Sequence, residues 1–102
     1  MSKLCWTDQA RNDVMDIYVS IGLEHAAAAG RFFDRIENKT QLLTLQPRMG
    51  AKRPDIRRNL RMVLDAPYLI LYRIEPDDDS SPVTQVEVVR IIDGRRELSA
   101  LL

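Results

Sequence analysis

Apolar residues recur at helical spacing in the first half of the chain and at strand spacing in the second half. After Thr7 they return every three or four positions, which predicts an amphipathic helix. Its inward stripe is expected to be Ala10, Val14, Ile17, Tyr18 and Ile21. Asp13 falls off that stripe. Thr7 or Asp8 can cap the start of the helix, and Gly22 should end it.

A second helix is predicted after a very short link. Ala26 and the three alanines that follow it favour helix strongly, and Pro47 cannot continue one. Its inward stripe is expected to be Ala29, Phe33, Ile36, Thr40 and Leu43, widened by Phe32 and Leu42. Two amphipathic helices joined so tightly form an antiparallel hairpin.

The remaining elements are predicted to be strands and loops. Strands are expected at 3–6, 60–64, 68–74 and 83–92. The strand at 68–74 is an almost unbroken apolar run, as expected of a central strand covered on both faces. Residues 47–59 and 76–82 have the composition of surface loops, and 95–102 form a short terminal helix or a tail.

The element order β-α-α-β-β-β predicts an α+β fold in a single domain that spans 1–102. The natural arrangement has two layers, with the helical hairpin packed on one face of a small antiparallel sheet. We expect the hairpin and the sheet to leave an apolar groove that a partner could fill.

The charge is balanced overall but unevenly distributed. The chain has 15 basic and 15 acidic residues, which excludes a whole-protein field that attracts nucleic acid. Residues 48–61 carry six cations and one acid, whereas 62–82 carry one cation and five acids. The basic loop could meet phosphates or an acidic protein, or its arginines could stay in water. Arg61 and Arg90 lie within apolar strand runs, where internal pairing or binding of acidic groups fits equally well.

Few side chains are available for catalysis. The only histidine, His25, falls at the predicted helix connection and is expected to be solvated. The only cysteine, Cys5, cannot form an internal disulfide and fits a small apolar filler. The acidic run at 77–79 is expected to be a solvated hairpin loop. With no metal-ligand cluster and no phosphate-binding loop, we expect no metal and no cofactor.

No stretch is long enough to span a membrane, and the first residues contain no apolar signal region. Together with the single cysteine, this predicts a cytoplasmic protein.

Several segments stand in a characteristic order. An aromatic strand end leads into a helix at 6–13, and Ile17-Tyr18 precedes an Ala-rich second helix. Phe33-Asp34-Arg35-Ile36-Glu37 is followed by Leu45-Gln46-Pro47-Arg48-Met49-Gly50, and then by the segments at 60–61, 68–73 and 88–98. In this order and spacing, almost end to end, the chain resembles the ParE toxins of bacterial type II toxin–antitoxin systems, which belong to the RelE/ParE superfamily.

The resemblance implies the RelE-like fold and a set of partners. ParE toxins poison DNA gyrase by binding it, and such systems are associated with plasmid stabilisation. A ParD-like antitoxin wraps the toxin with its C-terminal segment, so a hetero-oligomer is expected. Direct, specific binding to nucleic acid is not expected without the antitoxin.

Two departures define the alternatives. RelE-type enzymes cleave mRNA on the ribosome with a basic residue where this chain has Leu69, and with a C-terminal tyrosine where it ends in leucines. Leucine cannot move a proton or stabilise phosphorane charge, so a non-enzymatic toxin is favoured over an endonuclease. Asp93 stands where ParE-like sequences often have histidine, which leaves a nontoxic, antitoxin-binding relative as a third reading.

The charge pattern and the resemblance together give seven candidate contacts with the target or the antitoxin. These are Arg48, Arg61, Arg90, Arg95, Arg96, Leu98 and Leu101.

Overall fold

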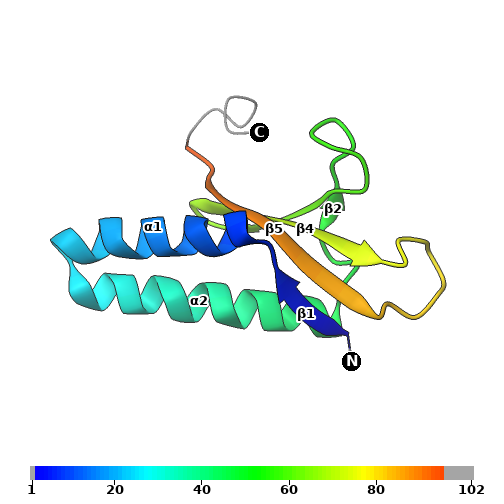
Figure 1. Cartoon of the computed structure of the whole chain (residues 1–102), viewed down its shortest axis with the longest axis horizontal. Coiled ribbons are helices and arrows are strands. Elements are labelled where there is room, and N and C mark those ends of the chain that lie inside the picture. Colours follow the sequence, from blue (N-terminus) through cyan, green and yellow to red (C-terminus); the bar gives the residue numbers. More distant parts are fainter. Residues whose placement is uncertain (1, 96–102) are drawn as a thin grey trace.

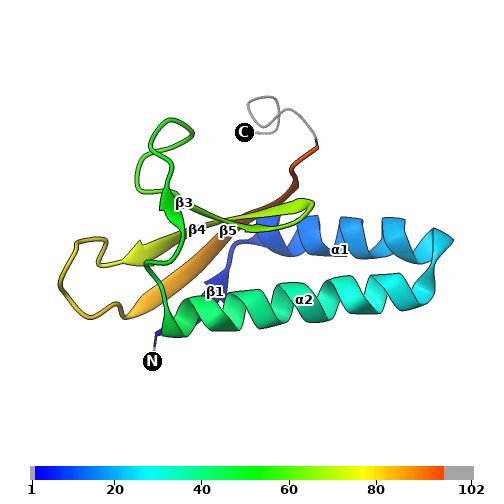
Figure 2. The same ribbon diagram turned by 180° about the vertical axis from the view of Figure 1, so that it is seen from behind.

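The computed structural model describes residues 2–95 and has two layers, a helical hairpin and a five-stranded sheet (Figures 1 and 2). The elements are β1 (Lys3–Trp6), α1 (Asp8–Glu24), α2 (Ala26–Leu45), β2 (Ala51–Lys52), β3 (Arg61–Asp65), β4 (Tyr68–Glu75) and β5 (Gln85–Asp93). The predicted α+β class and the helical hairpin are confirmed. No helix in the described part of the chain is both long and apolar enough to cross a membrane.

The sheet has the strand order β1-β5-β4-β3-β2. Strands β2 to β5 pair in antiparallel fashion, but β1 runs parallel to β5, with Lys3 opposite Gln85 and Trp6 opposite Val88. The sheet is therefore mixed, where the sequence predicted an antiparallel one. A parallel neighbour needs a long connection, and the intervening helices and strands provide it. The predicted loop at 47–59 also contains β2, which pairs with the start of β3.

The two helices are joined by one residue. Thr7 caps α1, because its Oγ1 accepts a hydrogen bond from the N–H of Ala10 at 3.0 Å. The helix continues to Glu24, two residues past the predicted end at Gly22. Gly22 stays helical and lies close to α2, where an added Cβ would come within 3.7 Å of the Ala29 side chain. His25 is exposed, as predicted, and its Nδ1 caps α2 by accepting from the N–H of Ala28 at 3.1 Å.

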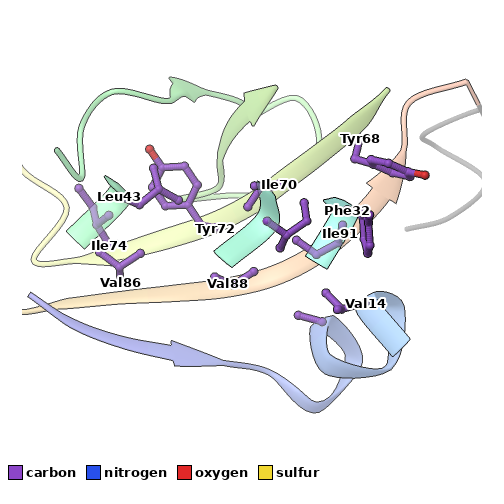
Figure 3. Close-up of a cluster of buried hydrophobic side chains, with 12 residues drawn as sticks. Val14, Phe32, Leu43, Tyr68, Ile70, Tyr72, Ile74, Val86, Val88 and Ile91 are labelled. Atoms are coloured by element: carbon purple, nitrogen blue, oxygen red, sulfur yellow. The ribbon is translucent and has the colours of Figure 1, made fainter. Parts of the chain in front are cut away.

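The main core lies between the hairpin and the sheet (Figure 3). Its labelled members are Val14, Phe32, Leu43, Tyr68, Ile70, Tyr72, Ile74, Val86, Val88 and Ile91. The rings of Phe32 and Tyr68 meet edge to face with centroids 4.9 Å apart. A second, smaller cluster covers the other face of the sheet and contains Leu60, Leu71, Val89 and Ile92. Strand β4 is thus buried on both faces, as predicted.

Two inward stripes differ from the prediction. Phe32 is 4% exposed and fills the core, whereas Phe33 is 43% exposed. Helical spacing allows either phenylalanine to follow Ala29, and the contact between Phe32 and Tyr68 selects the first. On α1, Tyr18 faces outward against Phe33 with ring centroids 6.2 Å apart.

Candidate functional site

The helical hairpin carries a second apolar stripe that faces away from the sheet. On α1, Tyr18 and Val19 lie three and four residues after Met15, and Leu23 lies four residues after Val19; Phe33 joins them from α2. Met15 and Val19 are more than half exposed, and Leu23 is almost fully exposed. We call these five residues the outer stripe. A contiguous exposed apolar patch on a small protein marks an interaction surface.

An apolar hollow of about 440 Å³ adjoins the outer stripe, between β1, α1 and α2. Leu4 and Trp6 of β1 form one wall, and Met15 and Phe33 form the other. A smaller hollow of about 270 Å³ shares Met15 and Phe33 and continues along the hairpin. β1 also ends the sheet in the described part of the chain, so its outer edge lies beside the larger hollow.

Sequence reasoning expected an apolar groove but did not identify the outer stripe. The helical spacing predicts a core position for Phe33 and assigns no role to Met15. The available signal was a second set of apolar residues at helical spacing on the first helix, offset from the inward stripe.

Arg61 is held inside the protein at one end of the sheet. Its Nη2 donates to Asp77 Oδ1 at 2.9 Å, its Nη1 donates to the Gly50 carbonyl at 3.2 Å, and the residue is only 4% exposed. Of the two readings left open by the sequence, internal pairing is therefore the one found for this arginine. Asp77 takes part in this pair, so the acidic run is not wholly solvated.

The other two aspartates of the acidic loop, Asp78 and Asp79, lie beside two further cations of the basic segment. Arg48 donates from Nε to the Asp78 carbonyl at 2.8 Å and from Nη2 to the Ser81 carbonyl at 2.7 Å. Lys52 Nζ lies 3.8 Å from Asp79. Hydrogen bonding by Ser81 and by the N–H of Ser80 lowers the pKa of Asp78. The acidic loop therefore pairs with three of the six cations of the basic segment, namely Arg48, Lys52 and Arg61.

Tyr72 fixes the turn that follows α2. Its hydroxyl accepts from the N–H of Gly50 at 2.8 Å and donates to the Pro47 carbonyl at 2.9 Å. An added Cβ at Gly50 would lie 2.4 Å from that hydroxyl oxygen, so only glycine fits there. Burial raises the pKa of the Tyr72 phenol above its usual value, partly offset by the Gly50 hydrogen bond.

Arg90 pairs with a carboxylate on α1. Its Nε lies 2.8 Å from Asp13 Oδ2, and the same oxygen accepts from the N–H of Ile91 at 3.0 Å. Asp13 is buried, although it falls off the predicted apolar stripe. The reason is topological, because β1 stops opposite Val88 and no other strand of residues 2–95 pairs with the rest of that edge of β5. Two side chains provide hydrogen bonds to this edge of β5 in place of a strand. Thr7 donates to the Val89 carbonyl at 2.8 Å, and Asp13 accepts from the N–H of Ile91.

The candidate arginines therefore separate into two groups by their side-chain contacts, although the backbones of Arg61 and Arg90 lie opposite the neighbouring residues Tyr72 and Leu71 of β4. Arg48 and Arg61 contact the acidic loop that follows β4, whereas Arg90 and Arg95 line a groove beside α1. Arg95 is exposed and pairs with Asp93, with Nη2 and Oδ2 2.6 Å apart. The remaining candidates, Arg96, Leu98 and Leu101, lie outside the described residues.

The position compared with RelE-type enzymes is apolar in its surroundings as well as in its side chain. Leu69 of β4 is paired with Leu64 on one side and Ile92 on the other. These neighbours provide no group that could move a proton.

Comparisons with known proteins agree with the geometry. The family model described as "ParE toxin of type II toxin-antitoxin system, parDE" matches residues 4–98. Toxin ParE3 of Caulobacter vibrioides is 34% identical over 87 residues, which cover 85% of this chain and 77% of that protein. A solved structure titled "Chromosomal ParDE TA system from P. aeruginosa" superposes with a TM-score of 0.70 at 22% identity, over 91% of this chain and 96% of the other. The first two matches establish the family and the third supports the fold, so the chain belongs to the ParE toxin family of type II toxin–antitoxin systems.

Proposed function

We propose that this ParE-family chain is held inactive by a ParD-type antitoxin, and that its target is DNA gyrase, which it inhibits by binding. ParE toxins act through protein contacts and are not enzymes. The observation that carries the antitoxin proposal is the apolar surface formed by the outer stripe and the two hollows beside it.

This surface suits a segment that folds as it binds. An amphipathic helix places apolar side chains three or four residues apart, which matches the spacing of the outer stripe. The open edge of β1 could accept an extended stretch of the same segment through backbone hydrogen bonds. Antitoxin tails of this kind cover large surfaces once they are ordered.

The seven arginines and leucines singled out from the sequence remain our proposed contacts with the target or the antitoxin. Arg95 has a 71% exposed side chain and Arg48 a 33% exposed one, so both can reach a partner directly. Arg61 and Arg90 are engaged with carboxylates, so we propose that they act by holding the loops and the strand around them. Arg96, Leu98 and Leu101 would extend this surface beyond Arg95.

Binding measurements on three purified variants test the antitoxin surface. Met15→Ser and Phe33→Ser should each weaken the complex with the ParD-type antitoxin encoded beside this chain by about 30-fold, as expected of anchor residues. Both side chains are exposed, so the free energy of unfolding should stay within about 0.5 kcal/mol of the parent. Leu64→Ser is the matched control, because Leu64 is 58% exposed away from both hollows. Unchanged affinity in the two hairpin variants would place the antitoxin elsewhere.

A supercoiling assay tests the target. Purified chain should stop DNA gyrase from supercoiling and cause cleaved DNA to accumulate, and the antitoxin should reverse both effects. Normal supercoiling at saturating protein would remove gyrase as the target. The antitoxin proposal would still stand or fall on the binding measurements.

A further inference from the structure

A separate groove of about 700 Å³ lies on the opposite face of α1 from the outer stripe. It runs between this helix and the end of β5, and the start of β4 closes it below. Figure 1 shows that this region lies where α1 approaches the end of the orange strand, away from the acidic loop. None of the five outer-stripe residues lines it, whereas Arg90 and Arg95 do.

The groove has an acidic balance. Its lining contains two guanidinium groups, from Arg90 and Arg95, and four carboxylates, from Asp13, Asp16, Glu24 and Asp93. With His25 neutral, the net charge of the lining is −2. Asp13 is engaged by Arg90, and Asp93 by Arg95. Asp16 and Glu24 are exposed and form no ion pair with another described residue.

The groove also has an apolar floor with a polar group in it. Ile17, Ile21 and Ile92 supply aliphatic surface. Tyr68 is 8% exposed, and its ring packs against Phe32 inside the core. Figure 3 shows its hydroxyl pointing away from the cluster of apolar side chains. Within residues 2–95 this hydroxyl has no hydrogen-bond partner, although it belongs to a buried residue that lines the groove.

The acidic side chains follow the groove along its length. Asp13, Asp16, Ser20 and Glu24 are spaced three or four residues apart, so they stand on one side of α1. At a rise of about 1.5 Å per residue, Asp13 and Glu24 are separated by about 16 Å along the helix. An extended peptide covers that distance with about five residues.

We infer that this groove binds a segment of a partner protein in which arginine or lysine side chains alternate with apolar ones. Carboxylates attract the charged heads, while the aliphatic stems and neighbouring apolar side chains lie on the isoleucines. The Tyr68 hydroxyl can pair with the backbone or the cation of the segment. Phosphate-bearing ligands are disfavoured because the carboxylates would repel them. The inference is independent of the outer stripe and the two hollows beside it, since the groove shares no residue with them.

A peptide titration followed by methyl NMR tests the inference on the full chain. The probe is acetyl-Arg-Leu-Ala-Leu-Arg-amide, and the control is the same peptide with citrulline at both arginines, which keeps the shape and removes the charge. The arginine peptide should shift the methyl signals of Ile17, Ile21 and Ile92. The citrulline peptide should bind at least fivefold more weakly.

Variants identify the groups responsible. Asp16→Asn and Glu24→Gln should each lower the affinity for the arginine peptide by about two- to fivefold, as expected for exposed ion pairs. Asp34→Asn makes the same charge change on α2 beside the smaller apolar hollow and should leave the affinity unchanged. Phe33→Ser should weaken antitoxin binding but not peptide binding, which separates failure of this inference from failure of the proposed function.

Four outcomes would overturn the inference. They are no binding of the arginine peptide, equal binding of the citrulline peptide, signal changes centred on Met15 and Phe33, and equal losses in the Asp34 control. Binding that appears only after residues 96–102 are deleted would also count against it, because the occupant would then be the chain's own C-terminus.

Discussion

Replacing Tyr72 by phenylalanine removes one oxygen atom that serves two backbone groups. The Gly50 N–H, which donates to it at 2.8 Å, is buried and would lose its partner. An unsatisfied buried donor costs about 1–3 kcal/mol. The Pro47 carbonyl is only half-buried, so water can replace its lost hydrogen bond. We therefore expect Tyr72→Phe to lower the free energy of unfolding by about 2 kcal/mol, or Tm by about 10 °C.

Gly50→Ala probes the same contact from the other side. The new Cβ would lie 2.4 Å from the Tyr72 hydroxyl oxygen and 2.9 Å from the Met62 carbonyl oxygen. Since one of these neighbours is backbone, the clash should destabilise the fold by about 1–3 kcal/mol. Combining both changes removes the closest contact, whereas those with the Met62 carbonyl oxygen and with a Tyr72 ring carbon at 2.7 Å remain. The double variant should therefore be more stable than the sum of the single effects predicts, by at least about 0.5 kcal/mol.

Urea unfolding with a common m-value is the appropriate assay, because it isolates stability from changes in the unfolded state. Tyr18→Phe serves as the control, since Tyr18 lies on the outer stripe and its exposed ring should tolerate the change within about 0.5 kcal/mol. If Tyr72→Phe also stayed within that margin, or if the two single effects simply added, the hydroxyl would not be what holds the turn after α2.

Three further results are expected. Arg61→Ala should destabilise the fold by about 3 kcal/mol in chemical denaturation, because it leaves Asp77 without its partner, whereas the exposed Arg57→Ala should change stability by less than about 0.5 kcal/mol. Thr7→Ala should lower the free energy of unfolding by about 2 kcal/mol in the same assay, since it removes a helix cap and a hydrogen bond to β5. A decrease of only about 1 kcal/mol, the value expected for the cap alone, would show that the hydrogen bond to β5 contributes nothing. Because the pKa of Asp78 is lowered in the folded protein, its ionised carboxylate stabilises the fold at pH values above its usual pKa, and this contribution is lost as pH falls below about 4. The free energy of unfolding of Asp78→Asn, measured across an acid titration, should therefore decrease less than that of the parent.

Local chemistry was enough to predict most elements. Thr7 followed by helical spacing identified the first helix, and Pro47 identified the end of the second within two residues. The apolar run at 68–74 correctly indicated a strand buried on both faces. Spacing alone could not choose between Phe32 and Phe33, because both fit the helical period and only the contact with the sheet decides between them.

The sites depended on contacts that are distant in sequence. The strand setting of Arg61 and Arg90 left internal pairing and binding of acidic groups equally open, and it could not indicate which carboxylates would pair with them. Asp13 lies 77 residues from Arg90, and Asp77 lies 16 residues from Arg61. The first pairing follows from β1 stopping short along β5, and the second from the turn beyond β4. Both are consequences of strand order, which hydrophobic periodicity does not specify.

The pairing of β1 with β5 also sets when the chain can fold during synthesis. β5 lies between β1 and β4, yet among the strands of residues 2–95 it is the last to leave the ribosome. Contacts such as the one from Thr7 to Val89, separated by 82 residues, cannot form earlier. A nascent chain that stops before residue 85 therefore lacks the strand that joins the two ends of its sheet, and the helical hairpin has no complete surface on which to dock. The complete sheet is therefore expected to form only after β5 has been synthesised, and products truncated before it should be removed by proteolysis rather than accumulate as folded fragments.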